Sequence, residues 1–414
     1  MNDTKQKWFK EAKFGLFIHF GLYAQLAGEY KGKTTPFIAE WIMNTMDIPV
    51  NEYRELAKTF DPVNFDADMI ASKAASWGMK YLVFTSKHHE GYAMYDSDVS
   101  EYNSMKASPC HRDFVGELQE ACGKHGLKFG IYYSQAQDWD DPDGYMARHD
   151  NSNKNYRKYL DEKCLPQLRE LMEKYKDISL IWFDTPMGTT ADESKEMIQL
   201  VKSINPNVII SGRIGNGLGE YMTTGDNFIP ADPFMGDWEV PATLNDTWGF
   251  KKADLNWKDP QKLLVLLLKI NSRGGNYLLN IGPDATGKVP ERSMEILDEV
   301  GSYVKKNEDA IFATKRVEKY PYDLDWCVFT RKNNKFFIHV IEKKPRPEII
   351  NFFATIKNAY ILDTKEPVEF HLEETCEGPH CLELFAPEEY REKSGYCICL
   401  EIEEEQPTFE AIKL

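Results

Sequence analysis

The 414-residue sequence predicts an α/β fold in two parts: a (β/α)8-like barrel of the TIM type over residues 1–314, then a small C-terminal antiparallel β-sandwich domain over residues 315–414. Two observations predict it. Short apolar runs alternate with amphipathic stretches from about residue 14 to residue 314, which is typical of a barrel or of a doubly wound sheet. Beyond residue 315 the apolar positions alternate with polar ones, as in antiparallel sheets.

The strands expected in the first part are continuous apolar runs. Strands that are buried on both faces of a parallel sheet have this appearance. In chain order, they are residues 15–20, 80–86, 127–134, 178–184, 207–213 and 276–282.

The helices expected between these strands carry apolar residues at helical spacing. One begins after Asp113, whose carboxylate is suited to capping the free N–H groups of a first turn. The others cover residues 51–60, 66–77, 193–203, 263–270 and 293–304, together with a long helix that carries Leu160, Leu165, Leu168 and Met172 on one face.

Residues 214–250 interrupt this alternation. The segment holds six Gly and three Pro and has no strong periodicity. A long irregular segment inside an α/β domain is more often functional than accidental, so we expect it to contribute to a site.

The C-terminal part predicts a hairpin over residues 325–342 with a polar turn at Lys332–Asn334. Further strands are expected at residues 359–363, 381–386 and 396–403, where apolar and polar residues alternate. We therefore expect antiparallel pairing in this part.

Composition and charge exclude several classes of function. Aromatic residues make up 13% of the chain, which excludes a disordered protein and leaves rings available for binding. The formal net charge of -16 argues against a nucleic-acid-binding protein, because such proteins need a basic surface to displace counterions from phosphates. Adsorption to anionic membranes is disfavoured for the same reason.

No segment predicts a membrane span or a secretory leader. The longest purely apolar run, Leu263–Leu268, is far shorter than the ~20 residues of a membrane helix. The polar N-terminus lacks the apolar stretch of a signal peptide. We expect a cytoplasmic protein for the chain as given, with secretion open if a leader has been trimmed. The oligomeric state is not readable from the sequence, and a homo-oligomer stays open.

Reactive polar residues follow the ends of four predicted strands: His19, the pair His88 and His89, Asp184, and Arg213. In a parallel barrel, chemistry takes place at the C-terminal ends of the strands. A single strand-end histidine is more often structural than catalytic. Four strand ends that converge on one crevice favour a functional site.

Two kinds of chemistry suit this set. Polar groups surrounded by Trp and Tyr fit a sugar site, in which two carboxyl groups share the catalytic work. Alternatively, His19, His88, His89 and Asp184 could bind a divalent metal for hydrolysis. Metal-dependent barrel hydrolases usually begin with two ligating histidines one residue apart on the first strand, whereas His19 stands alone.

Several motifs, taken together, identify a family. They are WFKEAKFGLFIHFGLYA (8–24), EWIMNTM (40–46), FDADMIASKAASWGMKYLVFTSKHHEGYAMYDS (65–97), GLKFGIYYS (126–134), LIWFDTPMG (180–188), DTWGF (246–250) and NYLLNIGPDATGKVPERSMEILDEVG (276–301). In combination they resemble the α-L-fucosidases of glycoside hydrolase family 29. The resemblance covers about residues 8–314, and the family also leads us to expect the C-terminal β domain.

The resemblance implies a retaining exo-α-L-fucosidase that removes terminal α-L-fucose from oligosaccharides or glycoconjugates through a covalent glycosyl-enzyme intermediate, with no metal or other cofactor. Asp184, which closes the W-F-D strand, matches the family's nucleophile. A non-catalytic fucose-binding relative is an alternative, but such a protein would normally have lost this Asp. The residues that match the family's sugar-binding groups are His19, Glu40, Trp41, His88, His89, Tyr132, Trp182, Arg213 and Trp248.

The acid/base is less certain in the resemblance, because its sequence position varies among members. Many relatives have a Trp-Glu pair upstream of the W-G-[YF] motif, and Trp238-Glu239 fits it. Relatives often have Pro-Glu at an earlier position, where this chain has Gly225-Asp226. We therefore expect Glu239, on a loop, to be the acid/base, with Asp226 second and Asp237 third. The linkage preference stays open.

Overall fold

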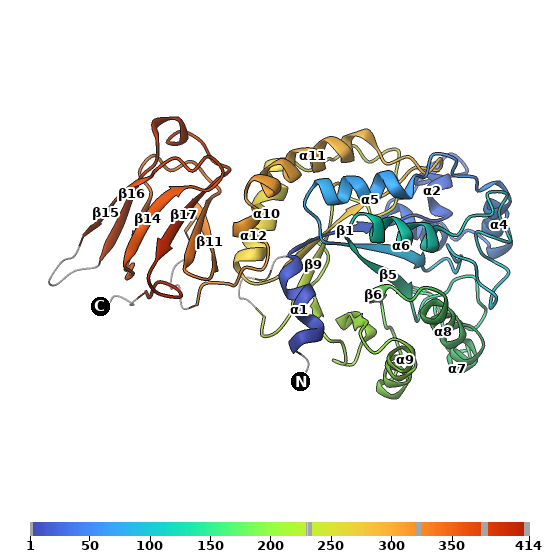
Figure 1. The fold of residues 1–414 in the computed structure, drawn as a ribbon. Coiled ribbons are helices and arrows are strands. Elements are labelled where there is room, and N and C mark those ends of the chain that lie inside the picture. Colours follow the sequence, from blue (N-terminus) through green and yellow to red (C-terminus); the bar gives the residue numbers. More distant parts are fainter. Residues whose placement is uncertain (1–2, 229, 231–233, 319–323, 374–379, 410–414) are drawn as a thin grey trace.

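Eight parallel strands form a curled sheet in the computed structural model, which describes residues 3–228, 230, 234–318, 324–373 and 380–409 (Figure 1). The strands are β1 (Phe14–Ile18), β4 (Tyr81–Lys87), β5 (Lys128–Ser134), β6 (Ile178–Asp184), β7 (Ile209–Ile210), β8 (Met222–Thr223), β9 (Trp238–Thr243) and β10 (Asn276–Ile281). Their order in the sheet is β7-β6-β5-β4-β1-β10-β9-β8. An isolated parallel bridge between Ser211 and Tyr221 joins the two outer strands. This arrangement confirms the predicted (β/α)8-like barrel.

Helices cover the outside of the barrel along most of its circumference (Figure 1). Asp113 caps α6 as predicted, accepting a hydrogen bond from the backbone N–H of Gly116 at 3.0 Å. The α-helices are α1 (Asp3–Ala12), α2 (Tyr23–Leu26), α3 (Ile42–Thr45), α4 (Val50–Arg54), α5 (Ala67–Ser76), α6 (Phe114–Lys124), α7 (Tyr156–Tyr159), α8 (Leu165–Lys174), α9 (Ala191–Ile204), α10 (Pro260–Ser272), α11 (Glu291–Lys306) and α12 (Glu308–Ile311). No helix among the described residues is long and apolar enough to cross a bilayer.

One side of the barrel is built without α-helices. Between β7 and β9, the described residues contain only a short 3-10 turn at Gly212–Ile214 and the two-residue strand β8. Two barrel strands therefore lie within the segment 214–250 that the sequence predicted to be irregular. They were missed because β8 is very short and because Pro241 interrupts the strand signal of β9.

Aromatic side chains fill the inside of the barrel. Tyr81 projects inward from β4, and a Cβ on Gly15 of β1 would lie only 2.4 Å from its ring, so glycine is needed at that position. Helix α1 closes the N-terminal end of the barrel, where Trp8 and Phe9 pack 6.0 and 5.9 Å from the ring of Tyr81. Because this end is plugged, access to the interior is left to the opposite end, where the strands terminate.

The C-terminal part contains two antiparallel sheets with an apolar core between them (Figure 1). One sheet has the order β11 (Cys327–Lys332), β12 (Lys335–Val340), β17 (Tyr396–Ile402) and β14 (Ile356–Ile361). The other has the order β13 (Glu348–Ile350), β16 (Cys381–Phe385) and β15 (Glu369–Glu373). The hairpin predicted over residues 325–342 is present as β11 and β12, so the predicted sandwich is confirmed.

A buried histidine joins the two parts. His339 of β12 lies 2.9 Å from the hydroxyl of Tyr303 on α11 and 3.2 Å from the carbonyl oxygen of Ala310 on α12. Burial lowers the pKa of His339 to about 4, so it stays neutral and acts as a buried polar contact between the two parts, beside the ion pairs of Lys332 and Lys335 with Asp309 of α12. A further short pair, β2 (Glu29–Tyr30) and β3 (Lys33–Thr34), lies in the loop after β1.

Candidate active site

A pocket of about 160 Å³ lies at the C-terminal ends of the barrel strands. This is smaller than the ~300–1,000 Å³ of sites for drug-sized ligands, and it suits a single sugar unit. The side chains around it are those of Phe17, His19, Phe37, Ile38, Glu40, Trp41, His88, Tyr132, Trp182, Asp184, Thr185, Arg213, Asp226 and Trp248. The structure thus brings together all the predicted site residues except His89 and Glu239.

Asp184, the last residue of β6, is held from several directions. Its Oδ2 accepts a hydrogen bond from the hydroxyl of Tyr132 at 2.9 Å, and its Oδ1 accepts one from Arg213 Nη1 at 3.0 Å. Its backbone N–H donates to Gln135 Oε1 at 2.9 Å. His89 Nε2 lies 3.5 Å from Oδ2, so this buried histidine backs the carboxylate without lining the pocket. The donors and the guanidinium stabilise negative charge on Asp184.

Arg213 connects two carboxyl groups. Its Nη1 contacts Asp184, and its Nη2 contacts Asp226 Oδ1 and the carbonyl oxygen of Thr224. Burial by itself lowers the pKa of Arg213, but the two neighbouring carboxylates raise it above its ordinary value. The side chain of Asp226 is 45% exposed, compared with 12% for that of Asp184. The pocket therefore contains one largely buried carboxylate and one that is about half exposed.

The histidines of the pocket are neutral. Burial, together with the proximity of His88, lowers the pKa of His19 to about 3, and burial lowers the pKa of His88 to about 3. His19 Nδ1 lies 2.7 Å from Asn280 Oδ1, and its other ring nitrogen, Nε2, takes no part in this hydrogen bond. Neutral imidazoles can both donate to and accept from sugar hydroxyl groups.

Aromatic rings form much of the pocket wall. Trp182 stacks on Tyr132 with ring centroids 5.7 Å apart, and the guanidinium of Arg213 lies 4.7 Å from the Trp182 ring centroid. The ring centroids of Trp248 and His19 are 5.1 Å apart. Flat faces of this kind suit the C–H surfaces and the methyl group of a deoxysugar.

Glu40 is a buried acid at the pocket. Its Oε2 accepts hydrogen bonds from the backbone N–H of Gly249 at 2.9 Å and from Thr247 Oγ1 at 3.3 Å. Its Oε1 has no hydrogen-bond partner among the described residues. Burial raises the pKa of Glu40 to about 7. The free oxygen is therefore available to a ligand hydroxyl.

Glu239 does not lie on a loop, and it does not reach the pocket. It is the second residue of β9, completely buried, whereas Asp184 ends β6 at the opposite end of the barrel. Its carboxylate accepts hydrogen bonds from Tyr81 at 2.5 Å and from Trp182 Nε1 at 2.8 Å. Trp182 separates it from the sugar pocket. The expectation that Glu239 lies on a loop is therefore wrong, and its buried place in β9 argues against the predicted acid/base role, because an acid/base must reach the leaving oxygen.

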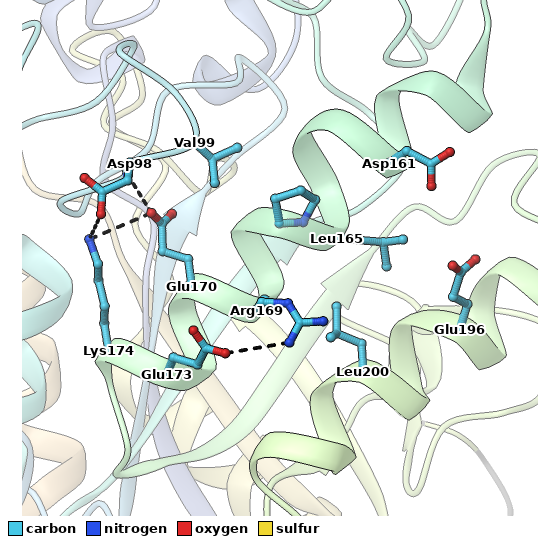
Figure 2. Close-up of a pocket in the computed structure, with 11 residues that line it drawn as sticks. Asp98, Val99, Asp161, Leu165, Arg169, Glu170, Glu173, Lys174, Glu196 and Leu200 are labelled. Carbon is cyan, nitrogen blue, oxygen red and sulfur yellow. Dashed lines mark hydrogen bonds and ion pairs between the residues drawn. The ribbon is translucent and has the colours of Figure 1, made fainter.

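A larger groove lies elsewhere on the molecule. It has a volume of about 560 Å³ and lies between α8 and α9 on the outside of the barrel, as Figure 2 shows. Its charged groups pair with one another: Lys174 lies 2.9 Å from Asp98, and Arg169 lies 3.7 Å from Glu173. Because barrel active sites lie at the ends of the strands, we assign the catalytic site to the smaller pocket.

The residues of the metal alternative are used in other ways. His19 pairs with Asn280, and His89 Nδ1 lies 2.6 Å from Ser134 Oγ. Among the residues that the structure describes, no three His, Cys, Asp or Glu side chains are grouped so that they could hold a metal ion. No observation favours the metal-dependent hydrolase.

Taken together, a barrel with two carboxyl groups on a shared arginine, in a pocket walled by aromatic rings, defines the class of a glycoside hydrolase. A family profile described as alpha-L-fucosidase matches residues 1–309. The chain belongs to the α-L-fucosidase family, and its activity is the hydrolysis of α-L-fucosides.

Similar proteins agree with this assignment. The α-L-fucosidase of Dictyostelium discoideum is 29% identical over 81% of this chain and 77% of its own length. The crystal structure of the α-L-fucosidase from Vibrio sp. strain EJY3 has 32% identity and a TM-score of 0.91, covering 98% of this chain and 74% of that one. AlfC from Lactobacillus casei, solved with its α-L-fucose product, has 43% identity and a TM-score of 0.70, covering 74% of this chain and 100% of that one.

Some residues of the site were not assigned from the sequence. Asp226 was ranked second because of the Gly-Asp departure from the family pattern, and Phe37, Ile38 and Thr185 were not considered. Asp226 lies in the irregular segment that we expected to be functional, and that segment was the available signal.

Proposed function

We propose that the protein is a retaining exo-α-L-fucosidase in which Asp184 is the nucleophile and Asp226 is the acid/base. One observation carries the proposal: both carboxyl groups contact Arg213 in a pocket sized for one sugar, and Glu239 does not. Retention is expected for two carboxyl groups that stand roughly 5–5.5 Å apart across the anomeric carbon.

In the first step, Asp184 attacks the anomeric carbon while the bond to the leaving oxygen breaks and Asp226 donates its proton to that oxygen. In the second step, Asp226 takes a proton from water, the water oxygen attacks the same carbon, and the bond to Asp184 breaks. The two inversions give fucose with its original anomeric configuration.

Asp226 must carry a proton before the first step. Its carboxyl group contacts Arg213, so this contact has to break before Asp226 can meet the leaving oxygen. The exposure of the Asp226 side chain allows that movement. Asp184 keeps its contacts with Arg213 and Tyr132, which gives the two carboxyl groups their different roles.

The rest of the pocket recognises the sugar. Neutral His19 and His88 and the free oxygen of Glu40 would bind hydroxyl groups, and Trp182 and Trp248 would cover the apolar face and the methyl group of fucose. A neutral sugar needs no electrostatic steering, so the net charge of -16 is compatible with this substrate.

The test is a panel of fucosylated oligosaccharides and an aryl fucoside, with free fucose as the readout. AlfC has been solved in complex with Fuc-α(1,6)-GlcNAc, which makes that disaccharide a suitable first member. NMR of the first-formed anomer reports retention or inversion. No fucose release from any member, or a first-formed product of inverted configuration, would remove the proposal.

A further inference from the structure

Lys258 makes three hydrogen bonds beside the segment that carries Asp226. Its Nζ lies 2.6 Å from Asn227 Oδ1, 2.7 Å from the carbonyl oxygen of Thr243 and 3.0 Å from Thr243 Oγ1. An ammonium group has three N–H donors, and here each has an acceptor. Lys258 thus links the residue after Asp226 to the last residue of β9.

Asn227 fixes the backbone next to Asp226. Its φ angle is 57°, in the left-handed region that Asn tolerates better than most residues. Its backbone N–H donates to the carbonyl oxygen of Pro241 at 2.9 Å, and its Oδ1 accepts a second hydrogen bond from the backbone N–H of Thr243 at 3.0 Å. The backbone after Asp226 is therefore tied to β9, while the Asp226 side chain stays free to move.

The ammonium group of Lys258 lies in partly buried surroundings. The residue is partly buried, and its own backbone N–H donates to the carbonyl oxygen of Leu244 at 2.8 Å. Burial lowers the pKa of Lys258 to about 8, although Asp246 and Asp254 oppose this. Hydrogen bonds from a charged donor are stronger than neutral ones, so the loss of the ammonium would weaken the hold on Asn227.

We propose that Lys258 is a positioning residue for the acid/base: through Asn227 and Thr243, it fixes the backbone from which Asp226 presents its carboxyl group to the leaving oxygen. The inference rests on the proposed role of Asp226. Lys258 itself does not touch the reacting atoms in this account.

This role predicts a dependence on the leaving group. A sugar leaves with difficulty unless its oxygen receives a proton, whereas a dinitrophenolate leaves without one. Small displacements of a catalytic group can cost large factors in rate. A misplaced Asp226 should therefore slow disaccharide cleavage and spare the dinitrophenyl substrate, whereas a purely structural defect would slow both equally.

The experiment measures kcat/KM of Lys258→Met on 2,4-dinitrophenyl α-L-fucoside and on Fuc-α(1,6)-GlcNAc. We expect a loss of ~10-fold or more on the disaccharide and of less than ~3-fold on the aryl substrate, since proton transfer contributes roughly 10²–10⁴-fold. Lys258→Arg should restore part of the disaccharide activity. Lys262→Met, which removes an exposed lysine on α10, is the matched control and should leave both values unchanged.

Asp226→Ala, measured in parallel, separates the two proposals. If Asp226→Ala shows no preference for the good leaving group, the proposed acid/base is wrong. If it shows the preference and Lys258→Met loses both activities equally, or neither, the positioning role is wrong. Should Lys258→Met fail to fold, Thr243→Val decides: it removes one acceptor and should show a weaker form of the same preference, and its absence would overturn the inference.

Discussion

Two charged clusters near the pocket have opposite arrangements. At the mouth, the single cation Arg213 is shared by Asp184 and Asp226. Behind the β4 and β5 ends, the anion Asp138 is shared by Lys87 and Lys163, each at 2.9 Å, and Asp140 lies 3.9 Å from Lys163. The side chains of the first cluster are 12–45% exposed, and those of the second are at most 9% exposed.

The difference in exposure separates two uses of charge. A partly exposed group can change its protonation and its partner at small cost, as an acid/base must. A buried ion pair cannot, because breaking it leaves an uncompensated charge in a medium of low dielectric constant. The second cluster holds the loop after β5, where the backbone N–H of Trp139 donates to the carbonyl oxygen of His89 at 2.7 Å. In the proposed mechanism, the first cluster performs the chemistry and the second supports it.

The largest effect on activity is expected in the cluster around Arg213. Asp184→Asn removes the nucleophile, and kcat on an aryl fucoside should fall by ~10⁴-fold or more. The melting temperature should change less than the activity, because Asn keeps the size of the side chain and an oxygen that can accept from Tyr132 or Arg213. Steady-state kinetics and thermal unfolding check both statements. Activity near that of the wild type would refute the assignment of the nucleophile.

In the buried cluster around Asp138, a substitution should lower stability more than activity. Asp138→Asn leaves Lys87 without its counter-charge and Lys163 with only Asp140 at 3.9 Å, and the free energy of unfolding should fall by ~3–5 kcal/mol. Burial alone would raise the pKa of Asp138, but the two ammonium groups lower it to about 2, so the wild-type pair is intact at neutral pH. Denaturant unfolding measures the loss. Wild-type stability combined with a large loss of kcat would mean that the cluster is catalytic.

Glu239 is a third kind of carboxyl group, buried without a contacting cation. Burial raises its pKa to about 7 from an ordinary value of 4.5, although hydrogen bonds from Tyr81 and Trp182 oppose the shift. The folded protein thus keeps a proton that the unfolded chain releases, and the stability of the wild type falls as the pH rises from 4.5 to 7.

Glu239→Gln lacks this dependence. Relative to the wild type, it should gain ~3 kcal/mol of stability above pH 7, at 1.36 kcal/mol per pKa unit. Its kcat should stay within ~10-fold of the wild-type value, since the residue contacts Trp182 and not the sugar. Unfolding at pH 5 and pH 8 measures the first effect. An equal stability difference at both values would contradict the buried, protonated state.

Much of the fold was readable because the strands β1, β4, β5, β6 and β10 are continuous apolar runs, each bounded by helices with caps such as Asp113. The polar residues at the ends of β1, β4, β6 and β7 also revealed His19, His88, Asp184 and Arg213. Between β7 and β9 this logic fails, because the described residues there include no α-helix.

The prediction that Glu239 lies on a loop shows why. A Trp-Glu motif cannot show whether its carboxylate lies on a loop or inside a barrel, because the depth of Glu239 depends on the register of β9 against Asn276 of β10. The links among Lys258, Asn227 and Thr243 are likewise tertiary, joining residues up to 31 positions apart. No local pattern records them.

The central claim, that Asp226 and not Glu239 is the acid/base, is tested most directly by azide rescue. Without its acid/base, a retaining enzyme still forms the glycosyl-enzyme from 2,4-dinitrophenyl α-L-fucoside, and azide then attacks it in place of activated water. We predict that azide accelerates Asp226→Ala and gives α-L-fucosyl azide, and that it does not accelerate Glu239→Ala. Azide rescue of Glu239→Ala with no effect on Asp226→Ala would contradict the account.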